Sequence, residues 1–181
     1  FLEWVKQRSH LTRGVTVGTM LRDEAFHFVR IGLYLERADN VSRTLEARWR
    51  DPGRRGERLV TEASEWSIVL RSLSAFQVYR RVYRSVVTPL RVTELLLMHE
   101  DMPRSVQSCL GDLYGHLLAV ANDRSAGTCR LAGGLHARFH FGRFEELVAG
   151  GIPQALDDLQ ARLREIGDGI SRDFLVPGVA A

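Results

Sequence analysis

Some residue types are scarce in this 181-residue chain, and their scarcity argues against several kinds of protein. Only two cysteines are present, Cys109 and Cys129, and they do not form a CxxC pair. Two isolated thiols are typical of a reducing compartment, so we expect a cytoplasmic protein with buried or half-buried thiols, the alternative being a disulfide or redox role. Apolar runs such as residues 95–98 and 117–121 are far shorter than the ~20 residues of a membrane-spanning helix, which predicts no membrane segment.

Motifs that carry chemistry by themselves are also missing. The chain has no Gly-x-Ser-x-Gly elbow and no His-Glu-x-x-His, and the glycine-containing segment 13–18 lacks the Lys-Ser/Thr of a phosphate-binding loop. Glu24 and His27 form one Glu-x-x-His pair, but di-iron bundles use two such pairs and two further glutamates. His136 and His140 lie four residues apart without a third ligand in the pattern. We therefore predict no catalytic residue, no metal and no cofactor of the chain's own.

Helical periodicity dominates what is present, and strand-like alternation is nearly absent. The five prolines separate the periodic segments instead of interrupting them. The sequence predicts an all-α fold, an antiparallel bundle of about seven helices with one long central helix, in a single domain over residues 1–181. The expected helical segments are 2–11, 19–49, 59–71, 74–86, 88–99, 100–121, 129–149 and 153–176. Residues 13–18 and 50–58 are predicted loops, and residues 176–181 a flexible tail.

Local signals set the expected ends of these helices. Thr19 is the expected N-cap of the long helix, and Ser74 with Gln77 fits a capping box. Thr88 and Pro89 fit a cap followed by a first-turn proline. The remaining expected boundaries are Pro103 in a first turn, a stop at Gly150 and Gly151, and Pro153 opening the last helix.

The long helix combines an apolar seam with a row of charges. The seam alternates steps of three and four residues, as in helical bundles: Phe28, Ile31, Leu35, Ala38, Ser42, Leu45 and Trp49. Beside it lies a second row: Gly32, Glu36, Asp39, Arg43 and Glu46. Asp39 and Arg43 form an acid–base pair four residues apart in the favourable order. The row allows three interpretations, namely an interhelical ion-pair network, a groove for a partner or ligand, or a catalytic or metal-binding carboxylate pair.

The basic residues are almost all arginine, because Lys6 is the only lysine. Such a bias reflects coding composition, so a formal net charge of +3 does not by itself indicate nucleic-acid binding. Arginines cluster in two places, residues 54–58 and 79–84. The second cluster also contains two tyrosines, which in a nucleic-acid interface would stack on bases. A solvated face or protein contact is the expected role, with a phosphate-bearing partner as the alternative.

Three stretches suggest a family: "GTMLRDEAFHFVRIGLYLERADNVSRTLEARW", "W-x3-LRSLSAFQVYRRVY" and "LLLMHEDMPRSVQSCL". Together they resemble the alpha-E family, a bacterial all-helical domain named for a Glu-Arg motif, which here is Glu36 and Arg37. The resemblance spans about residues 14–120. The family's usual domain is longer and carries a second Glu-Arg helix upstream. The chain is therefore expected to be a fragment that corresponds to the C-terminal half of such a domain, or somewhat more.

The resemblance implies an accessory role. Alpha-E proteins are typically encoded beside, or fused to, circularly permuted ATP-grasp proteins, and they also neighbour transglutaminase-like proteases and proteasome-like peptidases. We therefore expect a non-catalytic interaction module whose partner is an ATP-grasp amide or peptide ligase or a related peptide-processing enzyme. One alternative is a composite enzyme active site to which Glu36, Asp39 and Arg43 contribute. A second is nucleic-acid binding through the arginine clusters.

The candidate site residues fall into two groups. Glu36, Arg37, Asp39 and Arg43 map onto the family motif, and we expect Glu36, Asp39 and Arg43 to pair with residues of other helices. The second group comprises possible partner or anion contacts: Arg22, Arg80, Arg81, Arg84, Arg104 and Ser105. No metal ligand is predicted, and the oligomeric state is left open.

Overall fold

The computed structural model describes residues 1–50 and 59–175. The predicted loop at 51–58, with Arg54 and Arg55, and the predicted tail at 176–181 lie outside these ranges. Every element in the described ranges is helical, which confirms the all-α class. They are α1 (Leu2–Thr19), α2 (Glu24–Trp49), α3 (Leu59–Ser72), α4 (Phe76–Tyr83), α5 (Pro89–Met98), α6 (Val106–Ala119), α7 (Ala126–Phe141), the single turn α8 (Phe144–Leu147), α9 (Ile152–Ile170) and a π-helix (Ser171–Leu175).

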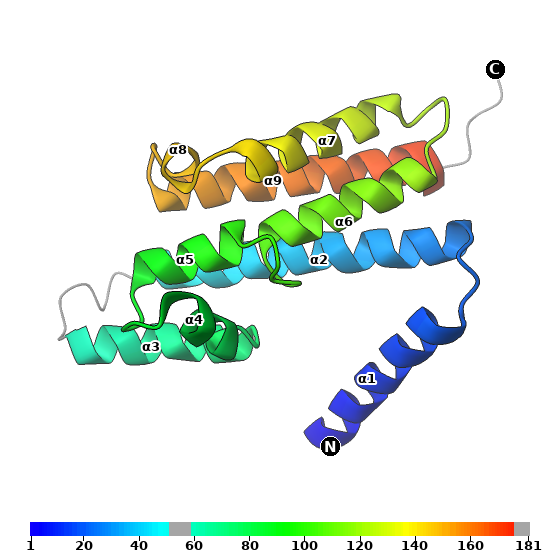
Figure 1. Ribbon diagram of the computed structural model, residues 1–181. Coiled ribbons are helices and arrows are strands. Elements are labelled where there is room, and N and C mark those ends of the chain that lie inside the picture. The colour runs from blue at the N-terminus through cyan, green and yellow to red at the C-terminus, as the bar shows by residue number, and fades with distance from the viewer. Residues whose placement is uncertain (51–58, 176–181) are drawn as a thin grey trace.

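The longest helix, α2, lies at the centre of the helical body. It packs mainly against α6 and α9, and α7 packs against both of these helices (Figure 1). Helices α3 and α4 lie beside α5, near the C-terminal end of α2 (Figure 1). Helix α1 leaves the N-terminal end of α2 and points away from the rest of the chain (Figure 1). None of the described helices is long and apolar enough to cross a bilayer.

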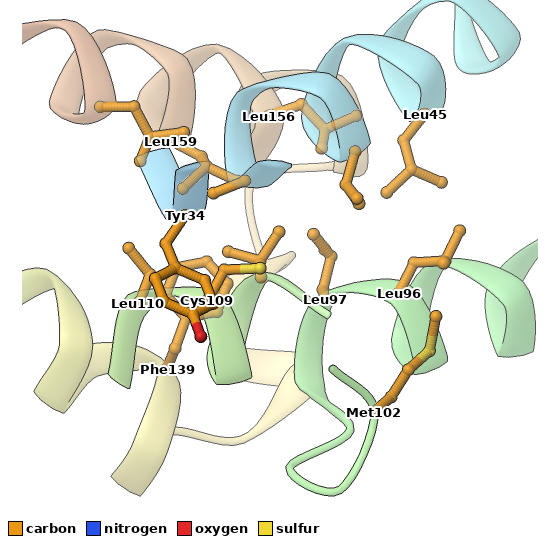
Figure 2. Close-up of a cluster of buried hydrophobic side chains, with 14 of the residues drawn as sticks. Tyr34, Leu45, Leu96, Leu97, Met102, Cys109, Leu110, Phe139, Leu156 and Leu159 are labelled. Atoms are coloured by element: carbon orange, nitrogen blue, oxygen red, sulfur yellow. The ribbon is translucent and has the colours of Figure 1, made fainter. Parts of the chain in front are cut away.

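The predicted seam of α2 lies in the core, together with residues that the pattern did not include. Ile31, Ala38 and Leu45 are buried, while the ends of the seam are only half-buried. Tyr34 and Val41 are buried too, so the contact stripe is wider than the predicted row. This width arises because α2 meets α6 on one side and α9 on the other. Figure 2 shows Tyr34 and Leu45 among core side chains that other helices contribute.

The first loop predicted from glycines is wrong, because residues 13–18 are part of α1. Thr19 ends this helix, and its hydroxyl donates to the Val15 carbonyl at 2.8 Å. The N-cap of α2 is Asp23, whose carboxylate accepts from the Phe26 amide at 3.1 Å. Aspartate is as good a cap as threonine or better, and it adds a negative charge at the positive end of the helix.

Three further boundaries differ from the sequence predictions. Helix α4 has Ala75 as N-cap without a side-chain cap, and Ser74 adopts φ +57°, so the capping box is wrong. Residue 84 is left-handed at φ +49°, which ends α4 at Tyr83 instead of Val86. The segment predicted as 129–149 divides into α7 and α8 at Gly142. A Cβ at Gly142 would collide with the Arg138 carbonyl, so the chain makes a close approach there that only glycine permits.

Other predicted helix ends are confirmed. Thr88 is the N-cap of α5, with Pro89 in its first turn. Pro153 lies in the first turn of α9, after Gly151. Pro103, however, precedes α6, and the buried Ser105 caps that helix by accepting from the Ser108 amide at 3.0 Å.

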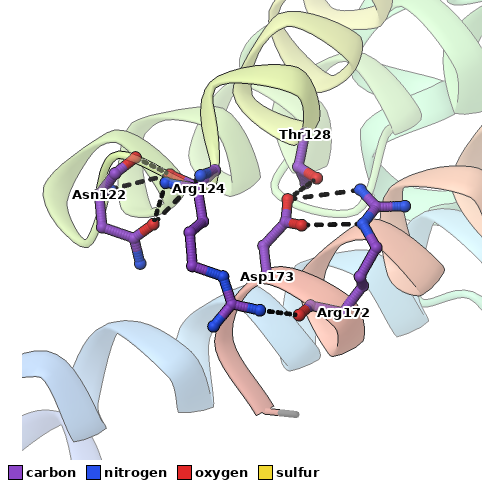
Figure 3. Close-up of polar contacts among 6 residues, drawn as sticks. Asn122, Arg124, Thr128, Arg172 and Asp173 are labelled. Atoms are coloured by element: carbon purple, nitrogen blue, oxygen red, sulfur yellow. Dashed lines mark hydrogen bonds and ion pairs between the residues drawn. The ribbon is translucent and has the colours of Figure 1, made fainter. Parts of the chain in front are cut away.

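Polar contacts hold the C-terminal end of α9 against the start of α7 (Figure 3). The buried carboxylate of Asp173 accepts from the Thr128 hydroxyl at 2.5 Å and from Arg172 Nε at 2.9 Å. These hydrogen bonds, the one from Thr128 first, lower the pKa of Asp173. Arg124 also donates to the Arg172 carbonyl at 3.0 Å. Two hydrogen bonds, one from Thr128 of α7 and one from Arg124 just before it, thus tie residues 172 and 173 to the start of α7.

Candidate functional site

The charged row of α2 lies at the surface, at the border of the core. Glu36 and Arg43 are exposed, and Arg37 and Asp39 are half-buried. Arg43 Nε donates to Asp39 Oδ2 at 2.6 Å, which raises the pKa of Arg43, and this pair stays within the helix. No described residue forms a hydrogen bond or ion pair with Glu36. The structure therefore differs from the expected network, since Glu36, Asp39 and Arg43 form no ion pair or hydrogen bond with another helix within residues 1–50 and 59–175.

Arg37 is the member of the motif that reaches another segment. Its guanidinium lies over the Tyr34 ring, 5.6 Å from the centroid, and one of its nitrogens is 3.5 Å from the Pro103 carbonyl. Burial raises the pKa of Cys109 to about 11, and the charges of Arg37 and Arg104 act in the opposite direction. The two arginines therefore lie close enough to this thiol to influence it. The structure thus brings Arg37 near the turn that contains Arg104 and the capping Ser105.

Further along the same row, the C-terminal end of α2 forms polar contacts with α9. Arg50 donates to Asp157 of α9 at 2.5 Å and pairs with Glu46 at 3.1 Å. Gln160 of α9 donates to Glu46 at 2.8 Å. On the opposite side of α2, Arg48 forms an ion pair with Glu65 of α3. Glu46 was part of the predicted row, but its partner in α9, Gln160, lies 114 residues further along the chain, and no local signal points to it.

Two grooves meet at Glu36. One lies between α2 and α9, has a volume of about 390 Å³, and is lined by Glu36, Asp39 and Arg43 with Arg164 and Asp168 of α9. The other lies between α1 and α2 and has a volume of about 710 Å³. Its lining combines apolar side chains of both helices with charged groups: Trp4, Val5, Phe28, Val29 and Leu33 with Arg8, Arg30 and Glu36. Glu36 of the Glu-Arg motif therefore borders both grooves, whereas Arg37 lines neither.

A histidine pair that the sequence patterns did not reveal joins α2 to α6. The Nδ1 atoms of His27 and His116 are 2.9 Å apart, and their ring centroids are 5.1 Å apart. One Nδ1–H donates to the other Nδ1, and the tautomers of the two rings decide which is the donor. Burial, and then the charges of His27 and Arg30, lower the pKa of His116. Tyr34 stacks on His116 with a centroid separation of 5.8 Å.

No metal centre is formed by the described histidines, cysteines and acids, since no three of them come together. His136 is half-buried against Tyr114 of α6 and stacks on the exposed His140 with ring centroids 5.2 Å apart. Glu24 and His27 lie on the first turns of α2. A hard cation needs six or more oxygens, which the described carboxylates of the α2 row do not supply.

The arginines of the second cluster, Arg80, Arg81 and Arg84, are exposed on or just after α4. The accompanying tyrosines are used inside the protein. Tyr79 is buried and donates to the Val86 carbonyl at 2.9 Å, and Tyr83 donates to Glu94 at 3.0 Å. Neither ring is presented as a free stacking platform for bases. Arg22 is exposed just before α2.

The comparisons with known proteins agree with the motif residues. A family model, Alpha-E, described as a predicted alpha-helical domain with a conserved ER motif, matches residues 1–175. Neither the curated proteins nor the solved structures give a match. The family match is longer than the resemblance at residues 14–120 and includes α1 and α9. The chain, with Glu36 and Arg37 in the middle of its longest helix, belongs to the alpha-E family.

Proposed function

We propose that the chain is a non-catalytic interaction module that docks a partner enzyme at the groove between α2 and α9. One observation carries this proposal. Three of the four charged side chains assigned to the family motif, Glu36, Asp39 and Arg43, line an open groove and pair with no described residue of another helix. Charges placed this way select a partner and steer its approach more than they stabilise a fold.

The groove offers a mixed pattern of charges to a partner. Asp39 and Arg43 present one acid and one base from α2, and Arg164 and Asp168 present a second pair from α9. Leu163 and Leu35 form the apolar part of the lining. An apolar strip between charges of both signs suits the edge of a folded protein, because such an interface combines apolar contact with a polar rim.

The family resemblance makes an ATP-grasp-type amide or peptide ligase the partner to test first. Alpha-E proteins are typically encoded beside such ligases, and an accessory subunit without catalytic groups needs an enzyme to act with. A cytoplasmic location belongs to the same proposal, because the ligase consumes ATP. The isolated thiols Cys109 and Cys129 are compatible with it.

Co-purification of a tagged chain with the neighbouring ATP-grasp protein tests the proposal. Exchanging Asp39→Arg and Arg43→Asp together keeps the net charge and an i,i+4 pair but reverses the pattern in the groove. We expect at least a tenfold loss of ligase binding. The matched control is the same exchange at Arg138 and Asp158, an exposed pair 3.6 Å apart that joins α7 and α9 away from the groove. Equal binding by both variants, or no complex with the ligase under any nucleotide condition, would contradict the proposal.

A composite active site is the second candidate, because Glu36 and Asp39 line the same open groove as two arginines. The two candidates separate on one substitution, Glu36→Gln, which keeps the size and removes the charge. In a composite site the ligase still binds and its turnover falls by at least a hundredfold. In a docking site, the variant lowers the turnover of the ligase only because less complex forms. An excess of the variant that saturates the ligase then restores the turnover.

A further inference from the structure

Helix α1 exposes large apolar side chains although it is part of the family match. Leu2 is 75 % exposed, Trp4 58 % and Leu11 57 %. The helix packs closely against none of the other described helices, and Figure 1 shows it directed away from them. Apolar residues gathered on one protruding element mark an interaction surface, because monomeric proteins seldom leave such an element uncovered.

The composition of α1 gives it little helical stability of its own. Gly14 and Gly18 lie inside the helix, and Cβ atoms at these positions would meet no other group. The second half is also rich in β-branched residues, which are poorer helix formers than unbranched ones: Thr12, Val15, Thr16, Val17 and Thr19. Most of the stability of a helix in a protein comes from packing of its apolar face, and α1 packs closely against no other described helix. Helix α1 therefore depends on a partner surface to persist.

The groove between α1 and α2 has the shape and charge to receive a helix. Gly32 leaves its wall open on the α2 side, and the short side chains of Ser9 and Thr12 leave room on the α1 side. Arg8 lines the groove from α1 and Glu36 from α2, and neither forms an ion pair with a described residue. The α1 wall thus carries the positive charge of Arg8, and the α2 wall carries the negative charge of Glu36 beside Arg30, which donates to the Tyr34 hydroxyl.

We propose that the occupant of this groove is helix α1 of a second copy of the chain. In a dimer with twofold symmetry, each α1 would lie in the other copy's groove, so that two α1 and two α2 helices form a four-helix interface. The charges favour this occupant, because a twofold axis can bring Arg8 of each copy opposite Glu36 of the other. The interface covers Trp4 and Val5 and supplies the packed face that α1 lacks. The proposed dimer goes beyond the docking of an enzyme at the α2–α9 groove, a neighbouring surface that shares Gly32 and Glu36 with this one.

Sedimentation velocity of the purified full chain over a hundredfold range of concentration tests the dimer. We expect a species of twice the 20.5 kDa monomer mass. Trp4→Glu should raise the dissociation constant at least a hundredfold, because it places a charge in the apolar part of the interface. The matched control is Leu90→Glu, since Leu90 of α5 is 57 % exposed and lies outside the groove. It should leave dimerisation unchanged.

A charge exchange tests the pairing itself. Arg8→Glu and Glu36→Arg should each weaken the dimer at least tenfold, because each places like charges opposite one another. The double variant should regain most of the lost affinity. A wild-type chain that stays monomeric at all concentrations, a Trp4→Glu variant that still dimerises, or a double variant weaker than both single ones would overturn the proposal. A monomeric chain would leave the enzyme-docking proposal intact, since ligase co-purification is measured separately.

Discussion

Helices α1 and α9 are nearly equal in length, with 18 and 19 residues, yet their surroundings are opposite. Helix α9 packs against α2 and α7, and its end is tied to Thr128 through Asp173. Helix α1 lies apart from the other described helices. The difference shows that length and apolar content do not decide how a helix is held in a protein.

The spacing of the apolar residues along each helix accounts for the difference in packing between α1 and α9. The apolar residues of α9 recur at alternating steps of four and three, and all of them are buried: Ile152, Leu156, Leu159, Leu163, Ile166 and Ile170. Such a row forms one continuous face, and burial of that face is the main source of helical stability in a protein. The apolar residues of α1 are distributed around the helix and include no comparable row. The helix can form several weak contacts but no single packed face within one chain.

The largest expected effect comes from removing one side chain of the buried row. Leu156→Ala should lower the free energy of unfolding by about 2–5 kcal/mol, because it removes buried apolar area and leaves a cavity. Leu11→Ala in α1 should change it by less than about 0.5 kcal/mol, because this side chain is largely in solvent. Urea denaturation at low protein concentration measures both. Similar losses for the two variants would mean that α1 is packed against the helical body after all.

Alanine in place of glycine should act in opposite directions in the two helices. A Cβ at Gly169 of α9 would collide with the Thr128 side chain, so Gly169→Ala should cost about 1–3 kcal/mol. A Cβ at Gly14 of α1 would meet nothing, so Gly14→Ala should stabilise the helix by up to about 1 kcal/mol. Thermal unfolding and circular dichroism measure the two changes. A destabilising Gly14→Ala would contradict an uncovered α1, unless it also weakened the proposed dimer.

The hydrogen bond between Thr128 and Asp173 should make the stability of the protein depend on pH in the acid range. The pKa of Asp173 is lowered in the folded protein, so this carboxylate contributes stability that is complete above its unfolded pKa, about 3.9, and is lost as the pH falls through the folded pKa. Thr128→Val removes the main cause of the shift. The variant should be less stable than the wild type at pH 6, and the gap between their melting temperatures should narrow between about pH 4 and pH 2. A gap that stays constant over this range would show that Asp173 does not titrate through this contact.

The smallest loss of stability is expected for the pair Asp39 and Arg43 of α2, which lines the groove between α2 and α9. Asp39→Ala or Arg43→Ala should lower the free energy of unfolding by only about 0.3–0.5 kcal/mol, because the pair is partly exposed and lies within one helix. Chemical denaturation in low and high salt measures it. A loss above about 2 kcal/mol would restore the interpretation of this row as a structural lock.

Much of the fold could be predicted because it depends on local spacing. The three- and four-residue spacing of apolar residues in α2 predicts that helix directly, and the prolines in the first turns of α5 and α9 predict where those helices begin. The extension of α1 through Gly14 and Gly18 could not be predicted, because glycine in a helix costs only about 1 kcal/mol and neighbouring residues decide whether the helix continues. The break at Gly142 depends on a close approach to a carbonyl, which no pattern encodes.

The candidate site was predicted in its residues but not in its contacts. Glu36, Asp39 and Arg43 do lie on one row of α2, as the helical period requires. Whether that row faces a neighbouring helix or open surface depends on how α2 is rotated against α6 and α9, and this rotation is set by the whole core. The pair of His27 with His116 was missed for the same reason, since the two residues are 89 positions apart.

Because Cys109 is buried, the rate at which its thiol reacts with a reagent reports how often the core opens. Its pKa of about 11 leaves almost no thiolate at neutral pH, and the side chain is covered in the folded state. Reaction with a thiol reagent therefore waits until α6 separates from its neighbours, so the labelling rate measures how often the core opens. The half-buried Cys129 on α7 is separated from Cys109 by most of α6 and by the turn that follows it. The ratio of the two labelling rates would distinguish local loosening of α7 from opening of the whole molecule.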